Sequence, residues 1–187
     1  ISNIVTGSIY WEALPPSTEL KKNLSNLHPK YSMLGILVNP EANAEDEIAN
    51  TLEKSVTFLD LITRQGISAD EVISNFSFSL SGGTDIFLDI AKIKALRILW
   101  YQIQGAYGIA KINPTHIHVT STAWVNENFQ PHGNLIKSTT SALAAIMGGC
   151  DSLTIEPEAH NSETMARVAL NVSSILREES NLSRVAD

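Results

Sequence analysis

Short runs of β-forming residues alternate along this chain with long stretches in which apolar residues recur every three or four positions. Such alternation is typical of βα units, whose strands lie parallel in one sheet. The pattern therefore predicts an α/β fold with about five parallel strands. The predicted strands are Gly7–Glu12, Ser32–Val38, Phe76–Leu80, His116–Ser121 and Ser152–Glu156.

The apolar spacing also predicts four helices. The first begins at Asn43, a suitable N-cap residue, and ends near Gly66. The others cover Thr84–Gln104, Asn134–Met147 and Met165–Leu176. In each of these three we expect the apolar stripe to be buried. The stripes comprise Ile86, Phe87, Ile90, Ile93 and Trp100, then Leu135, Ala142, Leu143 and Ile146, and finally Met165, Val168, Ala169, Val172, Ile175 and Leu176.

Charged and hydroxyl-bearing positions complete this pattern. In the Thr84–Gln104 helix, Asp85, Asp89 and Lys92 are expected on the solvent side. On three strands, small hydroxyl side chains stand at alternate positions, so each set shares one face of the sheet. Such a face is suited to line the narrow polar interior of a barrel, although Ser and Thr also occur freely in strands. These positions are Ser77, Ser79, Ser81, Thr120, Thr122, Ser152 and Thr154.

The chain has 187 residues, of which 43% are hydrophobic and 18% are charged. This balance is that of a folded globular protein, and it excludes intrinsic disorder, collagen and a disulfide-stapled miniprotein. The length suits one domain over residues 1–187 but falls short of the roughly 250 residues of a closed eight-stranded βα barrel. We therefore expect part of such a barrel, with first and last strands whose edges need covering.

The formal net charge of −7 makes nucleic acid and membrane surfaces unexpected partners. The one cysteine, Cys150, cannot form an internal disulfide and fits a reducing compartment, so we expect a cytoplasmic protein. The sequence begins at Ile1 rather than at a methionine and stops at Asp187 directly after a helical pattern. We therefore expect a piece of a longer protein.

Two features are candidates for ligand binding. His116 and His118 stand two residues apart on a strand, but zinc requires three or four ligands and no third is near in sequence. Buried or interface histidines are therefore favoured over a metal site. The Ser81–Thr84 turn joins a strand to a helix, where backbone amides are able to cradle an anion. A plain tight turn is the simpler interpretation, because no phosphate-binding motif is present.

Three other side chains are weaker candidates. Cys150 lies in a Gly-Gly-Cys-Asp turn without an obvious activating base, which favours ordinary packing over a nucleophilic role. Glu156 and Glu158 follow a strand, the place where barrel enzymes keep functional groups, but surface carboxylates are common in loops. None of these residues establishes a reaction.

Several blocks of the second half carry specific motifs. Thr84–Trp100 follows the pattern D-x-F-x-x-I-A-K-x-R-A-x-R-x-L-W, except that Lys94 replaces an arginine. The blocks that follow it in order are Thr120–Trp124, Asn134–Thr139, Gly148–Thr154, and Glu178–Leu182 with Arg184–Asp187. Over residues 76–187 the chain resembles the methylmalonyl-CoA mutase family, with a thinner match back through Gly35, Asn39 and Pro40.

This resemblance implies a segment from the latter half of the substrate-binding (βα)8 barrel of an adenosylcobalamin-dependent acyl-CoA mutase. In that family the cofactor supplies a radical that interconverts methylmalonyl-CoA and succinyl-CoA, and the protein holds CoA in the barrel. The hydroxyl-lined face would then contact the pantetheine arm. By position, Ser77, His118 and Ser152 match substrate-contacting residues of catalytic members, and Asp151 stands where those members have glutamine.

The departures from the family pattern point away from catalysis. Catalytic members have a Tyr-His pair where this chain has Ile36 and Leu37, and aliphatic side chains cannot hydrogen-bond a thioester carbonyl. Two arginines expected near the substrate carboxylate are replaced by Thr6 and Asn75. The D-x-H-x-x-G cobalamin motif of the family does not occur in the sequence.

These features are similar to those of the small, non-catalytic subunit of two-subunit bacterial mutases. We therefore predict a structural role in an isomerase complex. The chain is expected to have no catalytic residue and to bind neither metal nor cofactor, while adenosylcobalamin belongs to the parent complex and a large catalytic subunit is the partner. Self-association and acyl-CoA binding stay open. The alternatives are a divergent acyl-CoA mutase that still binds CoA through Ser77, His118 and Ser152, and a stand-alone acyl-CoA-binding module.

Overall fold

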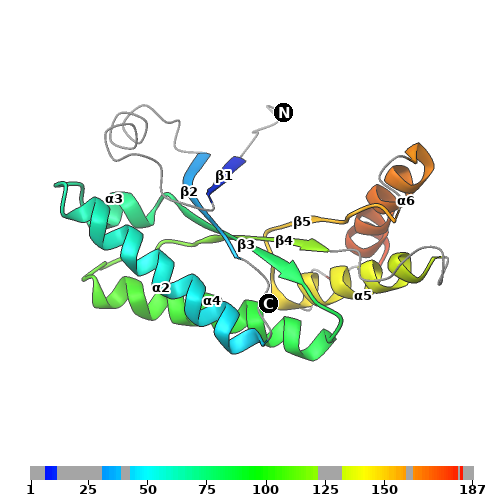
Figure 1. Cartoon of the computed structure of the whole chain (residues 1–187), viewed down its shortest axis with the longest axis horizontal. Coiled ribbons are helices and arrows are strands. Elements are labelled where there is room, and N and C mark those ends of the chain that lie inside the picture. Colours follow the sequence, from blue (N-terminus) through cyan, green and yellow to red (C-terminus); the bar gives the residue numbers. More distant parts are fainter. Residues whose placement is uncertain are drawn as a thin grey trace. The chain divides into compact units, whose positions relative to one another are not determined.

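The computed structural model describes residues 7–11, 31–38, 43–121, 132–158, 162–180 and 182. In these residues five strands follow one another in the sheet order β1-β2-β3-β4-β5 (Figure 1). The pairs β1–β2, β2–β3 and β4–β5 are parallel, which confirms the predicted α/β class. The strands are β1 Gly7–Trp11, β2 Tyr31–Leu37, β3 Phe76–Gly82, β4 His116–Ser121 and β5 Ser152–Thr154, all within two residues of the predicted bounds.

The four predicted helices are present, and the described residues contain a fifth that was not predicted. The short helix α3 has five residues, too few to show a periodic pattern, and it is capped by Ser68. Asn43 caps α2 as predicted, because its side-chain oxygen accepts a hydrogen bond from the amide of Asp46 at 2.8 Å. The helices are α2 Ala44–Thr63, α3 Ala69–Ile73, α4 Ile86–Ala106, α5 Gly133–Gly148 and α6 Glu163–Ser174, and α6 continues into the π-helical turn η1 Ile175–Glu179.

The chain divides into two compact units. One comprises Ile1–Ser79 with Arg97–His116, and the other comprises Leu80–Leu96 with Ile117–Asp187. Each unit has its own buried apolar residues. In the first they include Leu34, Ile36, Leu59, Ile62, Phe76, Phe78 and Trp100, and in the second Leu80, Ile93, Leu96, Val119, Ala142 and Ala145.

Three aromatic rings form the centre of the first unit. The ring centroids of Phe76 and Trp100 are 4.8 Å apart, and those of Phe78 and Trp100 are 5.2 Å apart with an edge-to-face angle of 82°. Trp100 is fully buried, and its indole nitrogen has no hydrogen-bond partner among the described residues. The indole therefore contributes apolar packing at the cost of an unsatisfied donor.

The strand registers show which residues share a face of the sheet. Side by side in β2 and β3 stand Gly35 with Ser77, Ile36 with Phe78, and Leu37 with Ser79. Laterally paired residues of neighbouring strands point to the same face. Ile36 is therefore on the face of Phe78, and both side chains are almost fully buried. Leu37 is on the opposite face, which carries the hydroxyls of β3.

The predicted orientation of α4 is wrong at three positions. Phe87 was expected in the core but is 82% exposed, whereas Asp89 and Lys92 were expected in solvent but are only 5% and 7% exposed. The residues that set the buried face are Ile93 and Trp100, and Asp89 lies four positions before Ile93 on the same side of the helix. The two charges are tolerated there because they pair with each other.

The predicted stripes of α5 and α6 are also only partly buried. The side of α5 that is buried carries small residues, including Ser138, Ser141 and Ala142, while Leu135, Leu143 and Ile146 are half-buried. Small side chains permit close approach of a helix to its neighbours. In α6 only Ala169 is buried, although the stripe is regularly spaced. Gly149 closes the C-terminal end of α5, with a φ of 82° in the left-handed region.

Candidate functional site

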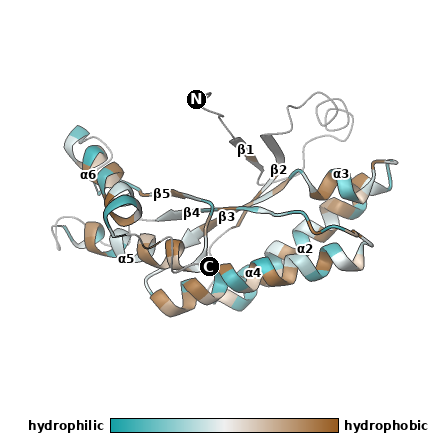
Figure 2. Ribbon diagram, turned by 180° about the vertical axis from the view of Figure 1, so that it is seen from behind, coloured by the Kyte–Doolittle hydropathy of each residue, from teal (hydrophilic) through white to brown (hydrophobic). Residues whose placement is uncertain are grey.

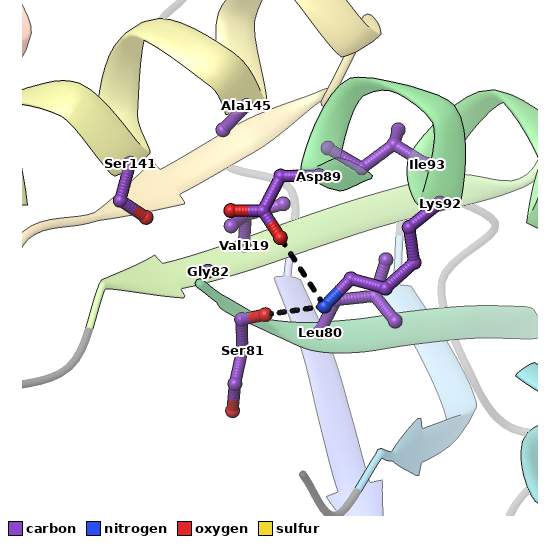
Figure 3. Close-up of a pocket in the computed structure, with 9 residues that line it drawn as sticks. All are labelled: Leu80, Ser81, Gly82, Asp89, Lys92, Ile93, Val119, Ser141 and Ala145. Atoms are coloured by element: carbon purple, nitrogen blue, oxygen red, sulfur yellow. Dashed lines mark hydrogen bonds and ion pairs between the residues drawn. The ribbon is translucent and has the colours of Figure 1, made fainter. Parts of the chain in front are cut away.

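A buried ion pair lies where β3 meets α4 in the second unit. The ammonium of Lys92 donates to the carbonyl oxygen of Ser81 at 2.9 Å and lies 3.5 Å from Asp89 Oδ1. Asp89 Oδ2 accepts a hydrogen bond from the amide of Gly83 at 2.6 Å. The pair therefore ties the first turns of α4 to the end of β3 (Figure 3).

The surroundings of this pair are closely packed. Residues of β3, α4, β4 and α5 line a pocket that has no room for a water molecule, and the side chains of Asp89 and Lys92 extend into it from α4 (Figure 3). Small-molecule sites usually have volumes of roughly 300–1,000 Å³. The pocket is therefore a packing feature of the turn rather than a ligand cavity.

Burial is the main influence on the carboxyl group of Asp89, and it raises the pKa above the ordinary value of 3.8. The Lys92 ammonium and the Gly83 amide oppose this rise, and the charge of Asp85 adds to it. The folded protein thus disfavours the carboxylate. The contribution of Asp89 to stability is full below the pKa of the unfolded chain and is lost as the pH rises through the folded-state pKa.

The candidate anion cradle at Ser81–Thr84, for which the sequence favoured a plain tight turn, is filled from within the chain. The amide of Gly83 points to a negative group, as the strand-to-helix turn suggested, but that group is the carboxylate of Asp89. A helix start that already holds a carboxylate offers little to an external anion. The structure therefore favours the simpler interpretation of a tight turn.

α5 lies close to β3 at Gly82. A Cβ atom added at Gly82 would lie 1.9 Å from Ser141 Oγ and 3.3 Å from Ser141 Cβ. Ser141 is 1% exposed, and its hydroxyl has no hydrogen-bond partner among the described residues. The absence of a side chain at Gly82 is thus required by the packing of α5.

Gly82→Ala is expected to destabilise the folded chain by about 1–3 kcal/mol, because the new methyl group overpacks a filled site. Adding Ser141→Gly should recover part of this loss, since both atoms that the methyl meets are removed, although a helical glycine itself costs about 1 kcal/mol. Urea denaturation of the four proteins of the double-mutant cycle measures the coupling. Additive effects would contradict the close approach of these two residues.

His118 and Ser152, two of the predicted substrate-contacting residues, lie side by side on β4 and β5. Their Nδ1 and Oγ atoms are 2.8 Å apart, and the other ring nitrogen, Nε2, is 3.1 Å from Thr120 Oγ1. Because hydroxyls both donate and accept, either neutral tautomer of the ring is accommodated. Both nitrogens are therefore engaged within the chain.

Asp151 fastens the turn between α5 and β5 to the start of β4. Its Oδ2 atom accepts a hydrogen bond from the amide of Ile117 at 2.8 Å. In return, the amide of Asp151 donates to the carbonyl oxygen of Ile117 at 2.8 Å. These reciprocal bonds give Asp151 a structural role beside any contact with a substrate.

Comparison with known proteins identifies the family. Residues 33–187 match the family described as methylmalonyl-CoA mutase. This chain belongs to the methylmalonyl-CoA mutase family. It is 32% identical over 170 residues to the methylmalonyl-CoA mutase small subunit of Porphyromonas gingivalis, covering 85% of this chain and 28% of that protein.

Two other mutases show similar likeness. Identity to the methylmalonyl-CoA mutase small subunit of Streptomyces virginiae is 29%, over 78% of this chain and 24% of the relative. Identity to the methylmalonyl-CoA mutase of Escherichia coli is 30%, over 78% of this chain and 21% of the relative. The chain thus spans about a quarter of the length of these mutases, and the family resemblance seen in the sequence is confirmed.

The positions that the sequence resemblance relates to the active site of catalytic members occupy different surroundings. Ile36 is 2% exposed and shares its sheet face with Phe78, whereas Leu37 is half-buried beside Ser79. Ser77 is fully buried, and its hydroxyl has no hydrogen-bond partner among the described residues. It lies in the first unit, and His118, Asp151 and Ser152 lie in the second. Thr6, one of the two substituted arginine positions, lies outside the described residues.

The weaker candidates have ordinary structural partners. Cys150 is half-buried, and its amide donates to the carbonyl oxygen of Ala145 at 3.0 Å. The amide of Glu156 donates to Ser121 Oγ at 3.0 Å. Glu158 Oε2 lies 3.2 Å from His132 Nδ1, at the start of α5.

No group of three or more His, Cys, Asp or Glu side chains in the described parts of the chain is arranged to hold a metal ion. No helix found there has the length and apolarity to cross a membrane. The feature that sequence reasoning missed is the Asp89–Lys92 pair. Its signal was the spacing of Asp89 and Lys92 relative to Ile93 and Trp100, which places all four on one side of the helix.

Proposed function

We propose that this chain forms part of the substrate barrel of a methylmalonyl-CoA mutase small subunit and supports the isomerase without taking part in its chemistry. The observation that carries this proposal is the pair Ile36 and Leu37. By resemblance to the family, these residues stand where catalytic members have a Tyr-His pair. Neither aliphatic side chain offers a donor to a thioester carbonyl. Ile36 also points into the apolar layer that contains Phe78, so this position serves packing.

The hydrogen bonds of His118 support the same proposal. A substrate that contacted this imidazole would have to displace either Ser152 or Thr120, which satisfy its two nitrogens at 2.8 and 3.1 Å. Exchanging one neutral hydrogen bond for another yields little net free energy. We therefore expect a CoA ester to gain little from His118 in this chain.

The candidate site around His118 offers no free imidazole to a cobalamin. The D-x-H-x-x-G motif is absent from the sequence, and the ring of His118 already has both nitrogens engaged. A cobalt-ligating histidine needs one free ring nitrogen. We accordingly assign adenosylcobalamin to the parent complex. We also propose that the partner of this chain is a large catalytic subunit and that the complex is cytoplasmic.

Calorimetric titration of the chain with methylmalonyl-CoA and succinyl-CoA tests the proposal. We expect a dissociation constant weaker than about 100 µM for both esters, because the two arginines and the Tyr-His pair of catalytic members are replaced in this chain. A catalytic mutase titrated under the same conditions is the control for the ligands. Submicromolar affinity, or isomerase turnover by this chain alone with adenosylcobalamin, would overturn the structural role.

A second candidate function is favoured by one observation. The cluster of His118, Thr120 and Ser152 places three polar side chains on neighbouring strands, in the half-buried positions expected of a face that contacts pantetheine. An acyl-CoA-binding barrel would use them. In that case His118→Ala would weaken binding of CoA esters at least tenfold, whereas the structural role predicts no change.

A further inference from the structure

A histidine and a buried carboxylate form a pair at the start of α5, within the second unit. His132 Nδ1 lies 3.2 Å from Glu158 Oε2, and the imidazole is 67% exposed whereas the glutamate side chain is only 7% exposed. The other carboxylate oxygen, Oε1, is buried and has no hydrogen-bond partner among the described residues. The imidazole is therefore the group that the charge of Glu158 meets.

The pair lies at the carboxyl ends of two strands. Glu158 comes four residues after the end of β5 at Thr154. Its loop is fixed to the last residue of β4, because the amide of Glu156 donates to Ser121 Oγ at 3.0 Å. The arrow of β4 points toward the end at which α5 begins, and α5 lies alongside β4 and β5 (Figure 1, Figure 2). Proteins built from parallel βα units keep functional groups at this edge of the sheet.

The backbone of His132 has an unusual conformation. Its φ of 63° and ψ of 6° lie in the left-handed region, and in the described parts of the chain it is the one residue other than glycine with a positive φ. Such backbone angles are uncommon for residues with a side chain, and they concentrate where the surrounding structure holds a functional group in place. Both the backbone and Glu158 therefore fix the position of this imidazole.

The carboxylate determines which ring nitrogen is available. A carboxylate only accepts hydrogen bonds, so Nδ1 of His132 carries the hydrogen and the lone pair of the neutral ring is on Nε2. Nε2 has no hydrogen-bond partner among the described residues, in contrast to both ring nitrogens of His118. The carboxylate also stabilises positive charge that develops on the ring, which makes Nε2 a better nucleophile.

We propose that His132 Nε2 accepts an acyl group from activated acyl donors and passes it to water. Nε2 attacks the acyl carbon, the bond from that carbon to the leaving group breaks, and the leaving group departs with the electron pair. Glu158 balances the positive charge of the acylated ring. Water then cleaves the new carbon–nitrogen bond, which releases the carboxylic acid and one proton and restores the neutral imidazole.

Charge favours an acyl donor over a phosphoryl donor. The neighbouring carboxylate and the net charge of −7 repel the charged oxygens of a phosphoryl group, whereas an acyl carbon carries no such charge. This activity does not depend on the role in a mutase complex, because the pair shares no residue with the positions that the family resemblance identified.

Hydrolysis of p-nitrophenyl acetate, followed by the absorbance of nitrophenolate, tests the proposal. We expect His132→Asn to lower the rate about tenfold or more, and asparagine tolerates the left-handed backbone. Glu158→Gln should lower the rate by a similar factor, because an amide oxygen still accepts from Nδ1 but does not balance the ring charge. Glu163→Gln, an exposed position on α6, is the matched control and should keep the rate.

Far-UV circular dichroism and urea denaturation establish that each variant is folded before its rate is compared. An unchanged rate in His132→Asn would overturn the proposal. A rate of Glu158→Gln equal to that of the unchanged chain would overturn the role of the carboxylate, and an equal loss in Glu163→Gln would show that the effect is not specific to the pair.

Thioesters and acyl phosphates are two biological forms of activated acyl donor. Release of thiol from acetyl-CoA and of phosphate from acetyl phosphate, measured with the unchanged chain and with His132→Asn, distinguishes them. We expect His132 to accelerate only the thioester reaction, because the phosphate charge of acetyl phosphate lies next to the acyl carbon. Acceleration of acetyl phosphate alone would overturn the charge argument, and dependence on His132 with neither donor would overturn the acyl-accepting role.

Discussion

Replacing Lys92 by methionine is expected to destabilise the folded chain by about 3–5 kcal/mol at neutral pH. The substitution removes the ammonium that lies 3.5 Å from Asp89 Oδ1 and leaves a carboxylate with 8% exposure facing an apolar side chain. Methionine keeps most of the length and apolar character of the lysine stem. The loss therefore reports the uncompensated charge rather than a cavity.

The effect of this substitution should depend on pH in a defined direction. Lys92 is the main influence that holds down the pKa of Asp89 against burial, so its removal raises that pKa further. The folded variant then binds a proton more tightly than the unfolded chain, and its stability falls as the pH rises. Urea denaturation at neutral pH and near the ordinary carboxyl pKa of about 4 should show a smaller loss at the acidic pH.

The double variant Asp89→Asn with Lys92→Met is the control. It removes both charges, and the asparagine oxygen is still able to accept the amide hydrogen of Gly83, so we expect it to be more stable than Lys92→Met alone. A single variant that is as stable as the double variant would show that the ion pair does not set the energetics of this turn.

Trp100→Ala is expected to cost about 3–5 kcal/mol, the usual loss when a fully buried aromatic side chain is removed. The indole is in contact with Phe76 and Phe78 at centroid distances of 4.8 and 5.2 Å. Both phenylalanines are themselves almost fully buried, so the neighbouring side chains have little freedom to fill the cavity. Loss of this side chain would expose both rings to a cavity. Thermal or urea denaturation followed by far-UV circular dichroism measures the loss.

Trp100→Phe should be far milder, with a cost below about 2 kcal/mol. It keeps an aromatic ring against Phe76 and Phe78 and removes the buried indole N–H, which has no hydrogen-bond partner among the described residues. An unsatisfied buried donor costs about 1–3 kcal/mol, so its removal offsets part of the lost volume. Equal losses for phenylalanine and alanine would contradict this explanation.

The element pattern was predictable because it depends on local spacing. Each strand lies within two residues of its predicted bounds, and the cap at Asn43 is formed as its residue type suggested. The short helix α3 was missed, because five residues span little more than one turn. The family was also recognisable from the sequence, since its motifs are specific and keep their order.

The candidate site was predictable only in part. The β4–β5 register brings His118 beside Ser152, as their positions on two strands of one face allowed. Alternation along a strand already places Ile36 and Leu37 on opposite faces of the sheet. Only the pairing with Phe78 and Ser79 shows that Ile36 is on the apolar face and Leu37 on the face with the hydroxyls. Their catalytic irrelevance, and the contacts of Ser77, His118, Asp151 and Ser152 with any substrate, stay predictions.

By itself the sequence determined the order of strands and helices, the parallel α/β class and membership of the mutase family, because these depend on periodicity and on motifs that are local in the chain. Only the tertiary structure decided that Asp89 and Lys92 are buried while Phe87 is exposed. The physical reason is that the burial of a helix face depends on which other elements cover it, and a charge enters the interior when its partner and a backbone amide are already in place there.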